Sequence, residues 1–369
     1  MIDQKIWDFA LSKIDKNIDE IGKGYPHGTV DGKYELGTLR QWVSGFWPGI
    51  LWQAFQITDN EKYAMLAREI EVEMDQKITN TEWIDHDNGF IWGLSAISDY
   101  RLTGNKDSRR RALLAANLLV GRFNVAGNFI RSWNDRETLD TKGLVIIDSV
   151  MNMPLLFWAS EETGDPRFRH VAEAHLSTVI QYFFREDGSV AQTCVFDPET
   201  GEFIEEIGNQ SYAEGSAWSR GAAWALYGFT LAARYTERPE FVDAAKSVAN
   251  FFVDQLGDKT APEWDFRAEA DHGEGRILLD TSAAAIAACG LIELTRLSGI
   301  KEFKEDAERI VTNLYEHHST KDDPDHQGML LDGTGHYPKQ KNLEVSLVYG
   351  DYFFTEAVST LLFDKPSFW

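Results

Sequence analysis

Cysteines and long apolar runs are both scarce in this sequence of 369 residues. Only Cys194 and Cys289 are present, and two cysteines this far apart form neither a disulfide framework nor a zinc-ligand spacing. We therefore expect a reducing compartment, the cytoplasm. No stretch approaches the ~18 apolar residues that a membrane span needs. The N-terminal segment also lacks the basic region and apolar run of a signal peptide. We expect no membrane partner.

Basic residues are in the minority as well. Lysine and arginine number 36 against 59 aspartates and glutamates, which gives a formal net charge of −23. Nucleic acids need basic faces and are disfavoured as partners, whereas a local cation could still admit a small anionic ligand. No HExxH, paired CxxC, GxGxxG or P-loop motif occurs, so we expect no metal and no cofactor. The twelve Trp and twelve Tyr favour a carbohydrate ligand, since aromatic faces stack on sugar rings.

A weak repeat of eleven residues predicts the architecture. Each copy has Thr or Ser second and Ala last, and four of the five copies have Tyr or Phe seventh. Asp, Gly and Pro in the repeat end one helix and begin another. The aromatic residue and the Ala then start the apolar stripe of the new helix. The copies are ITDNEKYAMLA from Ile57, LTGNKDSRRRA from Leu102, ETGDPRFRHVA from Glu162, YTERPEFVDAA from Tyr235 and LSGIKEFKEDA from Leu297.

Five such turns imply five helix pairs, and helices over residues 3–21 and 345–362 bring the number to twelve. The segments before the turns are small and apolar and are predicted to be buried, whereas those after the turns are more charged. This alternation predicts an all-α fold, an (α/α)6 barrel of six inner and six outer helices, as a single catalytic domain over residues 1–369. Strand signals are sparse, with one hairpin predicted within residues 188–208. The predicted inner helices before the turns cover residues 42–55, 88–100, 144–159, 215–234 and 281–296.

Polar and aromatic residues crowd the starts of these inner helices, which meet at one mouth of such a barrel. Some have ordinary structural explanations. Asp280 precedes Thr281 and Ser282, where a carboxylate caps a helix by accepting backbone N–H bonds. Asp85 fits a solvated or supporting group, and Asp351 fits either a structural or a catalytic role. The residues gathered at this mouth are Trp42, Trp47, Asp85, His86, Asp87, Trp133, Asp148, Asn152, Gln210, Trp218, Arg220, Asp280 and Asp351.

Asp87 and Asp148 differ from the other acidic residues. Asp87 lies among His86, Asn88 and Gly89, and Asp148 follows the apolar run GLVII, so we expect partial burial. Burial and a nearby like charge both raise the pKa of a carboxyl group. One acid would then stay neutral at about pH 6–7 beside an ionised partner, an arrangement that separates acid and base roles. On spacing alone, two structural acids are an equal alternative.

Taken together, the motifs resemble those of the unsaturated glucuronyl hydrolases, glycoside hydrolase family 88. The resemblance covers almost the whole chain, and the combination of HDxGF, DxxMN and SxWxRGxAW is specific. It implies an (α/α)6 barrel that releases a 4,5-unsaturated uronic acid from the non-reducing end of lyase-generated oligosaccharides, of glycosaminoglycan type or related. The matching segments are GFWPGI, HDNGF, IRSWN, IDSVMNMPLLFWA, FDPETGEF, SAWSRGAAW, PEWDF, DTSAAAIAACGLIEL and YGDYFF.

The resemblance also implies roles for individual residues. Asp148 is the expected general acid and then general base, and Asp87 is expected to bind ring hydroxyls and to hold up the pKa of Asp148. Gln192 stands where many members have His, and Asn209-Gln210-Ser211 replaces the more usual His-Gln-Gly. Lys339 and Lys341 either contact a sulfate on the next sugar or form a solvated basic loop. The residues expected to bind substrate are Trp42, His86, Trp133, Gln192, Gln210, Trp218 and Arg220.

Three other functions are considered. An unsaturated rhamnogalacturonyl hydrolase would share the fold but looks less similar around HDNGF. A sugar epimerase or isomerase generally uses paired His bases, and here Gln192 replaces one of them. A non-catalytic sugar-binding protein would not need both Asp motifs intact. The source polysaccharide, the sulfation preference and the oligomeric state, including a homodimer, stay open at this stage.

Overall fold

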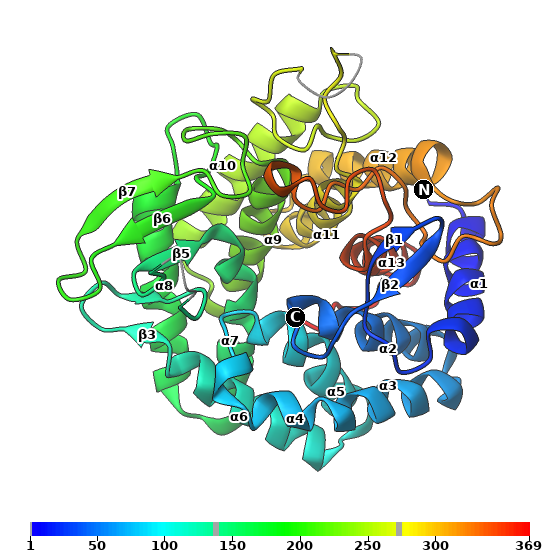
Figure 1. Cartoon of the computed structure of the whole chain (residues 1–369), viewed down its shortest axis with the longest axis horizontal. Helices are drawn as coiled ribbons and strands as arrows, with labels where there is room; N and C mark the ends of the chain where they lie inside the picture. Colours follow the sequence, from blue (N-terminus) through cyan, green and yellow to red (C-terminus); the bar gives the residue numbers. More distant parts are fainter. Residues whose placement is uncertain (1, 136–139, 271–274) are drawn as a thin grey trace.

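Twelve helices form two concentric rings in the computed structural model, which describes residues 2–135, 140–270 and 275–369 (Figure 1). Each inner helix contacts the inner helices before and after it, and the last contacts the first, so the inner ring is closed. Over these described ranges, the predicted all-α (α/α)6 barrel is confirmed. The outer helices are α1 (Gln4–Ile21), α3 (Glu61–Glu73), α6 (Lys106–Val120), α8 (Pro166–Phe183), α10 (Pro239–Leu256) and α12 (Lys301–His318).

Three of the inner helices are preceded by a segment of different helical pitch. The inner helices are α2 (Phe46–Thr58) after the 3-10 helix η1 (Trp42–Gly45), α5 (Ser98–Thr103) after the π-helix η3 (Gly89–Ile97), α7 (Met153–Thr163) after the 3-10 helix η4 (Ile147–Asn152), α9 (Ser219–Thr236), α11 (Thr281–Ser298) and α13 (Val348–Phe363). The short α4 (Asp75–Ile78) and η2 (Thr81–Trp83) follow α3. None of the described helices is long and apolar enough to cross a membrane.

The repeated turn joins an inner helix to the next outer helix by one local geometry. Its second residue, Thr or Ser, donates its hydroxyl to the carbonyl four residues earlier. Its third residue has a left-handed backbone with φ between 53° and 75°, which ends the first helix. In three turns the fourth residue is Asn or Asp, and its side chain caps the next helix. The left-handed residues are Asp59, Gly104, Gly164, Glu237 and Gly299.

Small residues let the inner segments approach each other closely. All residues of α11 from Thr281 to Leu294 are buried. A Cβ on Gly290 would lie only 2.9 Å from Leu226 of α9, and one on Gly89 would lie 2.4 Å from the Cα of Asn152. The second contact brings the start of η3 against η4. The segments that carry Asp87 and Asp148 are therefore held side by side by backbone packing.

Within the described ranges, three small sheets lie outside the helical rings. The strands β5 (Leu144–Ile146), β6 (Thr193–Phe196) and β7 (Phe203–Ile207) form one antiparallel sheet, and the pairing of β6 with β7 confirms the predicted hairpin. The hairpins β1 (Pro26–Val30) with β2 (Lys33–Leu36), and β3 (Phe123–Asn124) with β4 (Phe129–Ile130), were not predicted. In the first of these, Asp31 and Gly32 both have positive φ, a turn whose twist suits a two-residue hairpin.

The helix predicted over residues 345–362 begins only at Val348. Among the inner helices predicted before the turns, two also begin later in the chain than expected. Residues 144–146 form β5, so the third inner helix starts at Ile147. The fourth starts at Ser219 rather than at residue 215, because Trp218 makes a β-bridge to Asp265. In both cases pairing with a distant segment overrides a local apolar pattern that would also suit a helix.

Candidate active site

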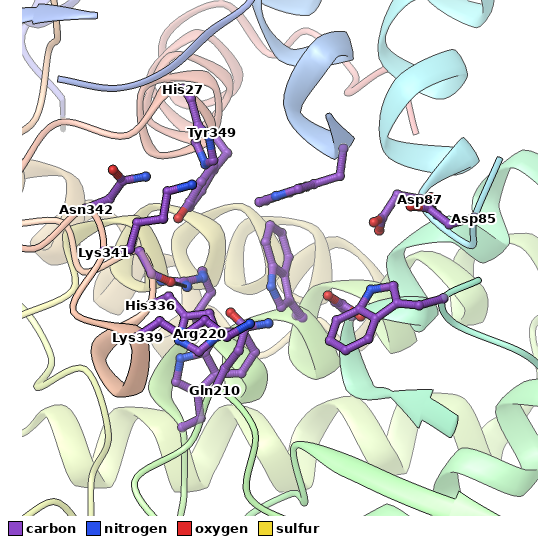
Figure 2. Close-up of a pocket in the computed structure, with 16 residues that line it drawn as sticks. His27, Asp85, Asp87, Gln210, Arg220, His336, Lys339, Lys341, Asn342 and Tyr349 are labelled. Carbon is purple, nitrogen blue, oxygen red and sulfur yellow. Dashed lines mark hydrogen bonds between the residues drawn. The ribbon is translucent and has the colours of Figure 1, made fainter. Parts of the chain in front are cut away.

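A cavity of about 360 Å³ opens where the N-terminal ends of the inner helices meet (Figure 2). Trp42 begins η1, Asp148 lies in η4, Trp218 caps α9 and Tyr349 lies in the first turn of α13. The starts of several inner helices thus converge on one space, as the sequence predicted. The cavity is lined by His27, Trp42, Asp85, Asp87, Trp133, Asp148, Gln210, Trp218, Arg220, Trp224, Gly335, His336, Lys339, Lys341, Asn342 and Tyr349.

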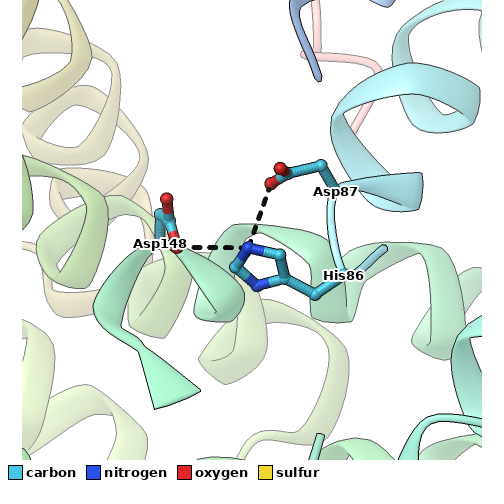
Figure 3. Close-up of side chains that lie close together, drawn as sticks. All are labelled: His86, Asp87 and Asp148. Carbon is cyan, nitrogen blue, oxygen red and sulfur yellow. Dashed lines mark ion pairs between the residues drawn. The ribbon is translucent and has the colours of Figure 1, made fainter. Parts of the chain in front are cut away.

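Two carboxyl groups and one imidazole meet at one side of this cavity (Figure 3). The Nε2 atom of His86 lies 3.5 Å from Oδ1 of Asp87 and 3.8 Å from Oδ1 of Asp148. The imidazole is fully buried, whereas the side chains of Asp87 and Asp148 are 8% and 17% exposed. Both carboxyl groups can therefore reach a bound ligand, and His86 lies beneath them.

The two carboxyl groups have unequal surroundings. Burial raises the pKa of Asp87 to about 6, and Lys77, Asn152 and Arg122 oppose this rise. Burial raises the pKa of Asp148 well above its usual range, and the charges of Asp87 and Asp85 raise it further. Near neutral pH this favours a protonated Asp148 beside an ionised Asp87. Burial also lowers the pKa of His86 to about 4, so its imidazole is neutral.

Backbone contacts fix the segment that carries Asp87. The backbone N–H of His86 donates to the carbonyl of Ser132, and the N–H of Asp87 donates to Oδ1 of Asp85, each at 3.0 Å. The N–H of Phe90 donates to Oδ1 of Asn152, also at 3.0 Å. Asn152 is four residues beyond Asp148 in the same 3-10 helix, so its carboxamide ties the two acid-bearing segments together.

Cationic residues line another side of the cavity, away from Asp85 and Asp87 (Figure 2). The guanidinium of Arg220 pairs with Asp280 and donates to the carbonyls of Thr334 and Gly335. Asp280 also accepts the N–H of Ser282 as the N-cap of α11, which confirms its capping role. The charge of Arg220 is thus already balanced inside the protein.

Lys339 and Lys341 have no ion pair with any carboxylate in the part of the chain that the structure describes. They flank the cavity beside two histidines (Figure 2). Burial, with the charges of Lys341 and Arg220, lowers the pKa of His27 to about 4. Burial, with the charges of Lys339, Arg220 and Lys341, lowers the pKa of His336 to about 4 as well. Both imidazoles are therefore neutral near pH 7, and the lysines carry the positive charge of this wall.

A model of glycosyl hydrolase family 88 matches residues 13–360. The chain belongs to glycosyl hydrolase family 88. An unsaturated glucuronyl hydrolase from Bacillus sp. (strain GL1) is 33% identical, over 100% of this chain and 99% of the relative. An unsaturated chondroitin disaccharide hydrolase from Streptococcus pyogenes serotype M1 is 30% identical, over 98% of this chain and 92% of the relative. A crystal structure also matches, that of an unsaturated glucuronyl hydrolase from Bacillus sp. GL1 that is responsible for the degradation of glycosaminoglycan. The TM-score is 0.92 and the identity 32%, and the match covers 98% of this chain and 97% of that chain.

This family 88 glycoside hydrolase places most, but not all, of its predicted site residues on the cavity wall. His86 lies behind the two carboxyl groups and does not line the cavity. Gln192 is 2% exposed, and its Oε1 accepts the backbone N–H of Gln210. The placement of these two side chains gives no support to the expected contact with a sugar. The predicted residues that line the cavity are Asp87, Asp148, Trp42, Trp133, Gln210, Trp218, Arg220, Lys339 and Lys341.

Several lining residues of the family 88 chain were not predicted from its sequence, among them His27, Asn342 and Tyr349. His27 is on β1, and the Asp31-Gly32 turn signal that would have revealed this hairpin lies four residues away. Asn342 has a left-handed backbone in the loop that carries the two lysines. Tyr349 lies in the YGDYFF segment, in which Asp351 was the predicted site residue. Asp351 instead faces away from the cavity and accepts bonds from Tyr34 and from the backbone of Met329 and Leu330.

Proposed function

We propose that this chain hydrolyses lyase-generated oligosaccharides and releases the 4,5-unsaturated uronic acid from their non-reducing end. Membership of family 88 supports this activity, as do relatives that are unsaturated glucuronyl and chondroitin disaccharide hydrolases. The observation that carries the proposal is the pair of buried carboxyl groups, Asp87 and Asp148, that faces one cavity with unequal pKa values. An anionic sugar bound between this pair and the lysine wall would meet both an acid and a cation.

The reaction begins with a proton transfer to carbon. The C4=C5 bond of the sugar is an enol ether, so its π electrons take the proton of Asp148 at C4, and positive charge develops at C5 and the ring oxygen. The Asp148 carboxylate then removes a proton from water as that water attacks C5. The resulting hemiketal opens, the link at C1 breaks, and a keto-uronate and a shortened sugar leave. One water is consumed, and Asp148 regains its proton.

The remaining lining residues bind and orient the ring. Ionised Asp87 accepts hydrogen bonds from ring hydroxyls, and its charge helps to keep Asp148 protonated. Trp42, Trp133 and Trp218 offer stacking faces along the cavity. Gln210 and Arg220 lie where they can donate hydrogen bonds to the uronate carboxylate. Because Asp280 already balances Arg220, this contact is a hydrogen bond more than a new ion pair.

Lys339 and Lys341 are proposed to contact an anionic group, such as a sulfate, on the sugar next to the uronate. Their charges lack a carboxylate partner among the described residues and line the cavity apart from the acids. A relative that acts on unsaturated chondroitin disaccharides supports substrates of glycosaminoglycan type. Neutral Lys339→Met and Lys341→Met variants should raise KM for sulfated disaccharides more than for unsulfated ones.

A panel of lyase-generated disaccharides, varied in linkage and sulfation, tests the activity. Ultraviolet absorbance of the conjugated double bond should fall as the wild-type chain turns over its substrate. Asp148→Asn should lose at least about 10²-fold in kcat, the range of general acid–base catalysis, and still bind the disaccharide in calorimetry. Unchanged turnover in this variant would contradict the mechanism. Turnover of rhamnogalacturonan-derived disaccharides alone would favour that alternative, and binding without product would favour a sugar-binding protein.

We further propose a cytoplasmic location. Both cysteines are buried free thiols, which suits a reducing compartment. Fractionation of cells that produce the protein checks this, and sedimentation of the purified chain tests the homodimer.

A further inference from the structure

Lys77 is a fully buried lysine that is in direct ion-pair contact with no carboxylate of the described residues. Its side chain is 0% exposed, and its ammonium donates to the carbonyls of Arg40 at 2.9 Å and Gln41 at 3.3 Å. No carboxylate in the described ranges forms an ion pair with it. An ammonium taken out of water without a carboxylate partner destabilises a fold.

The positive charge of Lys77 acts on the acidic side of the cavity, although Lys77 itself is not one of the lining residues. Lys77 lies on α4; burial lowers its pKa, and the charges of Asp85 and Asp87 oppose this fall and favour the ammonium form. It lowers the pKa of Asp87, whereas the cation that lowers the pKa of Asp148 is Arg220, across the cavity. Lys77 thus favours the ionised form of Asp87.

Arg122 contributes to the same field. It lies directly after α6, and its guanidinium donates to the carbonyls of Ile84, Arg131 and Ser132 and to Oδ1 of Asn134. These acceptors are uncharged, and among the described residues no carboxylate pairs with it. Arg122 also lowers the pKa of Asp87. Because its bonds hold the segment around Ile84, however, replacing it would disturb the backbone as well as the charge.

We propose that Lys77 is a positioning residue for the reaction: its buried charge keeps Asp87 ionised and so leaves the shared proton on Asp148. This inference rests on the proposed function. Two carboxyl groups that share a proton can hold it in either place, and only the form with the proton on Asp148 can protonate C4. The groups that face Asp87 are Asp85 and His86 from its own segment, Asp148 and Asn152 from η4, Lys77 from α4 and Arg122 from the turn after α6.

The sign of the effect follows from this arrangement. In the wild type, kcat should fall as the pH drops through the pKa of Asp87, about 6, because Asp87 becomes protonated. Without the charge of Lys77, Asp87 holds its proton up to a higher pH. The acidic limb of the pH–rate profile should therefore move upwards. The alkaline limb, set by Asp148, should move much less.

Lys77→Gln is the principal variant, since an amide still donates to the carbonyls of Arg40 and Gln41. Its acidic limb should lie about one pH unit above that of the wild type, with KM changed less than twofold at pH values above both limbs. Lys77→Met should show the same shift, and Lys77→Arg should restore the wild-type profile. An unmoved acidic limb in folded Lys77→Gln or Lys77→Met would overturn the proposal.

Lys13 offers a matched control. It is 4% exposed, and its ammonium donates to the carbonyls of Asp323 and His326, as Lys77 does to two other carbonyls. It lies on α1, and its charge acts on Asp323 and Asp351 rather than on the acid pair. Lys13→Gln should lower the melting temperature to a similar degree but leave both limbs in place. A shift of the acidic limb in Lys13→Gln would mean that lost stability alone moves it, which would contradict a specific role for Lys77.

A second measurement needs no turnover. In an Asp148→Asn background, the carboxyl carbon of Asp87 can be titrated by ¹³C NMR and assigned by comparison with Asp87→Asn. Adding Lys77→Gln should raise this titration midpoint by about one unit, and an unchanged midpoint would overturn the proposal. If wild-type protein cleaved no unsaturated disaccharide, the proposed function would fail. The titration would still decide whether Lys77 controls the proton of Asp87.

Discussion

At the scale of single residues, Gln192 anchors the loop that carries Gln210. Its Oε1 accepts the backbone N–H groups of Asn209 and Gln210, both at 3.3 Å, and the hydroxyl of Thr193 at 2.6 Å. Three donors thus converge on one buried oxygen. Gln210 lines the cavity, whereas Gln192 lies behind it. The neutral amide is suited to this place because it accepts these bonds without burying a charge.

Gln192→Ala should therefore weaken substrate binding more than chemistry. Without the shared acceptor, the loop at Gln210 loses its anchor, and KM should rise about tenfold while kcat changes less than threefold. The loss of a buried acceptor should also lower the free energy of unfolding by about 1–3 kcal/mol. Steady-state kinetics and urea unfolding measure both effects. Gln192→Glu keeps the acceptor oxygen and should retain a KM near that of the wild type; equal losses in the two variants would contradict an anchoring role.

The predicted residues that line the cavity and the lining residues that were missed differ in the range of the interactions that place them. Asp87, Asp148 and Trp218 lie at the starts of helices whose periodicity is visible in the local sequence. His27 and Asn342 come from a hairpin and a loop that meet the barrel only in three dimensions. Tyr349 and Asp351 are two residues apart on α13, so they point to opposite sides of the helix. The YGDYFF motif was recognised, but which side of the helix faces the cavity depends on contacts with distant parts of the chain.

At the scale of elements, the turn repeat explains why twelve helices could be predicted from one sequence. Each turn contains its own stop signal, and three of the five also supply a side-chain cap for the next helix. Both signals act within a few residues. The short strands lack such local control, because β5 exists only by pairing with β6 about fifty residues later. This is why residues 144–146 were predicted to be helical. The single domain over residues 1–369 stays a prediction.

The third position of the repeat provides a test of this local control. Glu237 is an exposed, non-glycine residue with φ 53°, and Gly164 occupies the same position of another turn with φ 70°. Glu237→Gly should raise the free energy of unfolding by about 0.5–1 kcal/mol, because glycine adopts this conformation without strain. Gly164→Ala should lower it by about 1 kcal/mol, although no atom lies within 4 Å of the added Cβ. Urea unfolding measures both; a stabilised Gly164→Ala would show that the backbone there is unstrained.

At the scale of the whole molecule, the net charge can be read from the composition, whereas the positive charge of the cavity can be located only in the structure. The chain carries a net −23, which the composition alone reveals. The lysine wall of the cavity opposes this field, but its location depends on a loop that packs against the barrel from the C-terminal part of the chain. Composition could therefore argue against nucleic acid as a partner, yet could not show where an anionic sugar would bind.

The large net charge also predicts how salt affects stability. Like charges repel within the folded chain, and added salt screens this repulsion. Exposed ion pairs weaken at the same time, but each contributes only about 0–1 kcal/mol. The repulsion of 23 excess negative charges should dominate. We expect the melting temperature to rise by about 2–4 °C between 10 and about 200 mM NaCl and then to level off as the Debye length falls below about 8 Å.

A charge variant separates this effect from other actions of salt. Glu199 and Glu305 are exposed, and within the described part of the chain their carboxylates form no ion pair. The double variant Glu199→Gln and Glu305→Gln should melt at a higher temperature than the wild type in 10 mM NaCl and should gain less from added salt. The two proteins should converge at high salt, because screening has then removed the repulsion that the substitutions relieve. A melting temperature that falls as salt is added would show instead that the surface ion pairs outweigh the net charge.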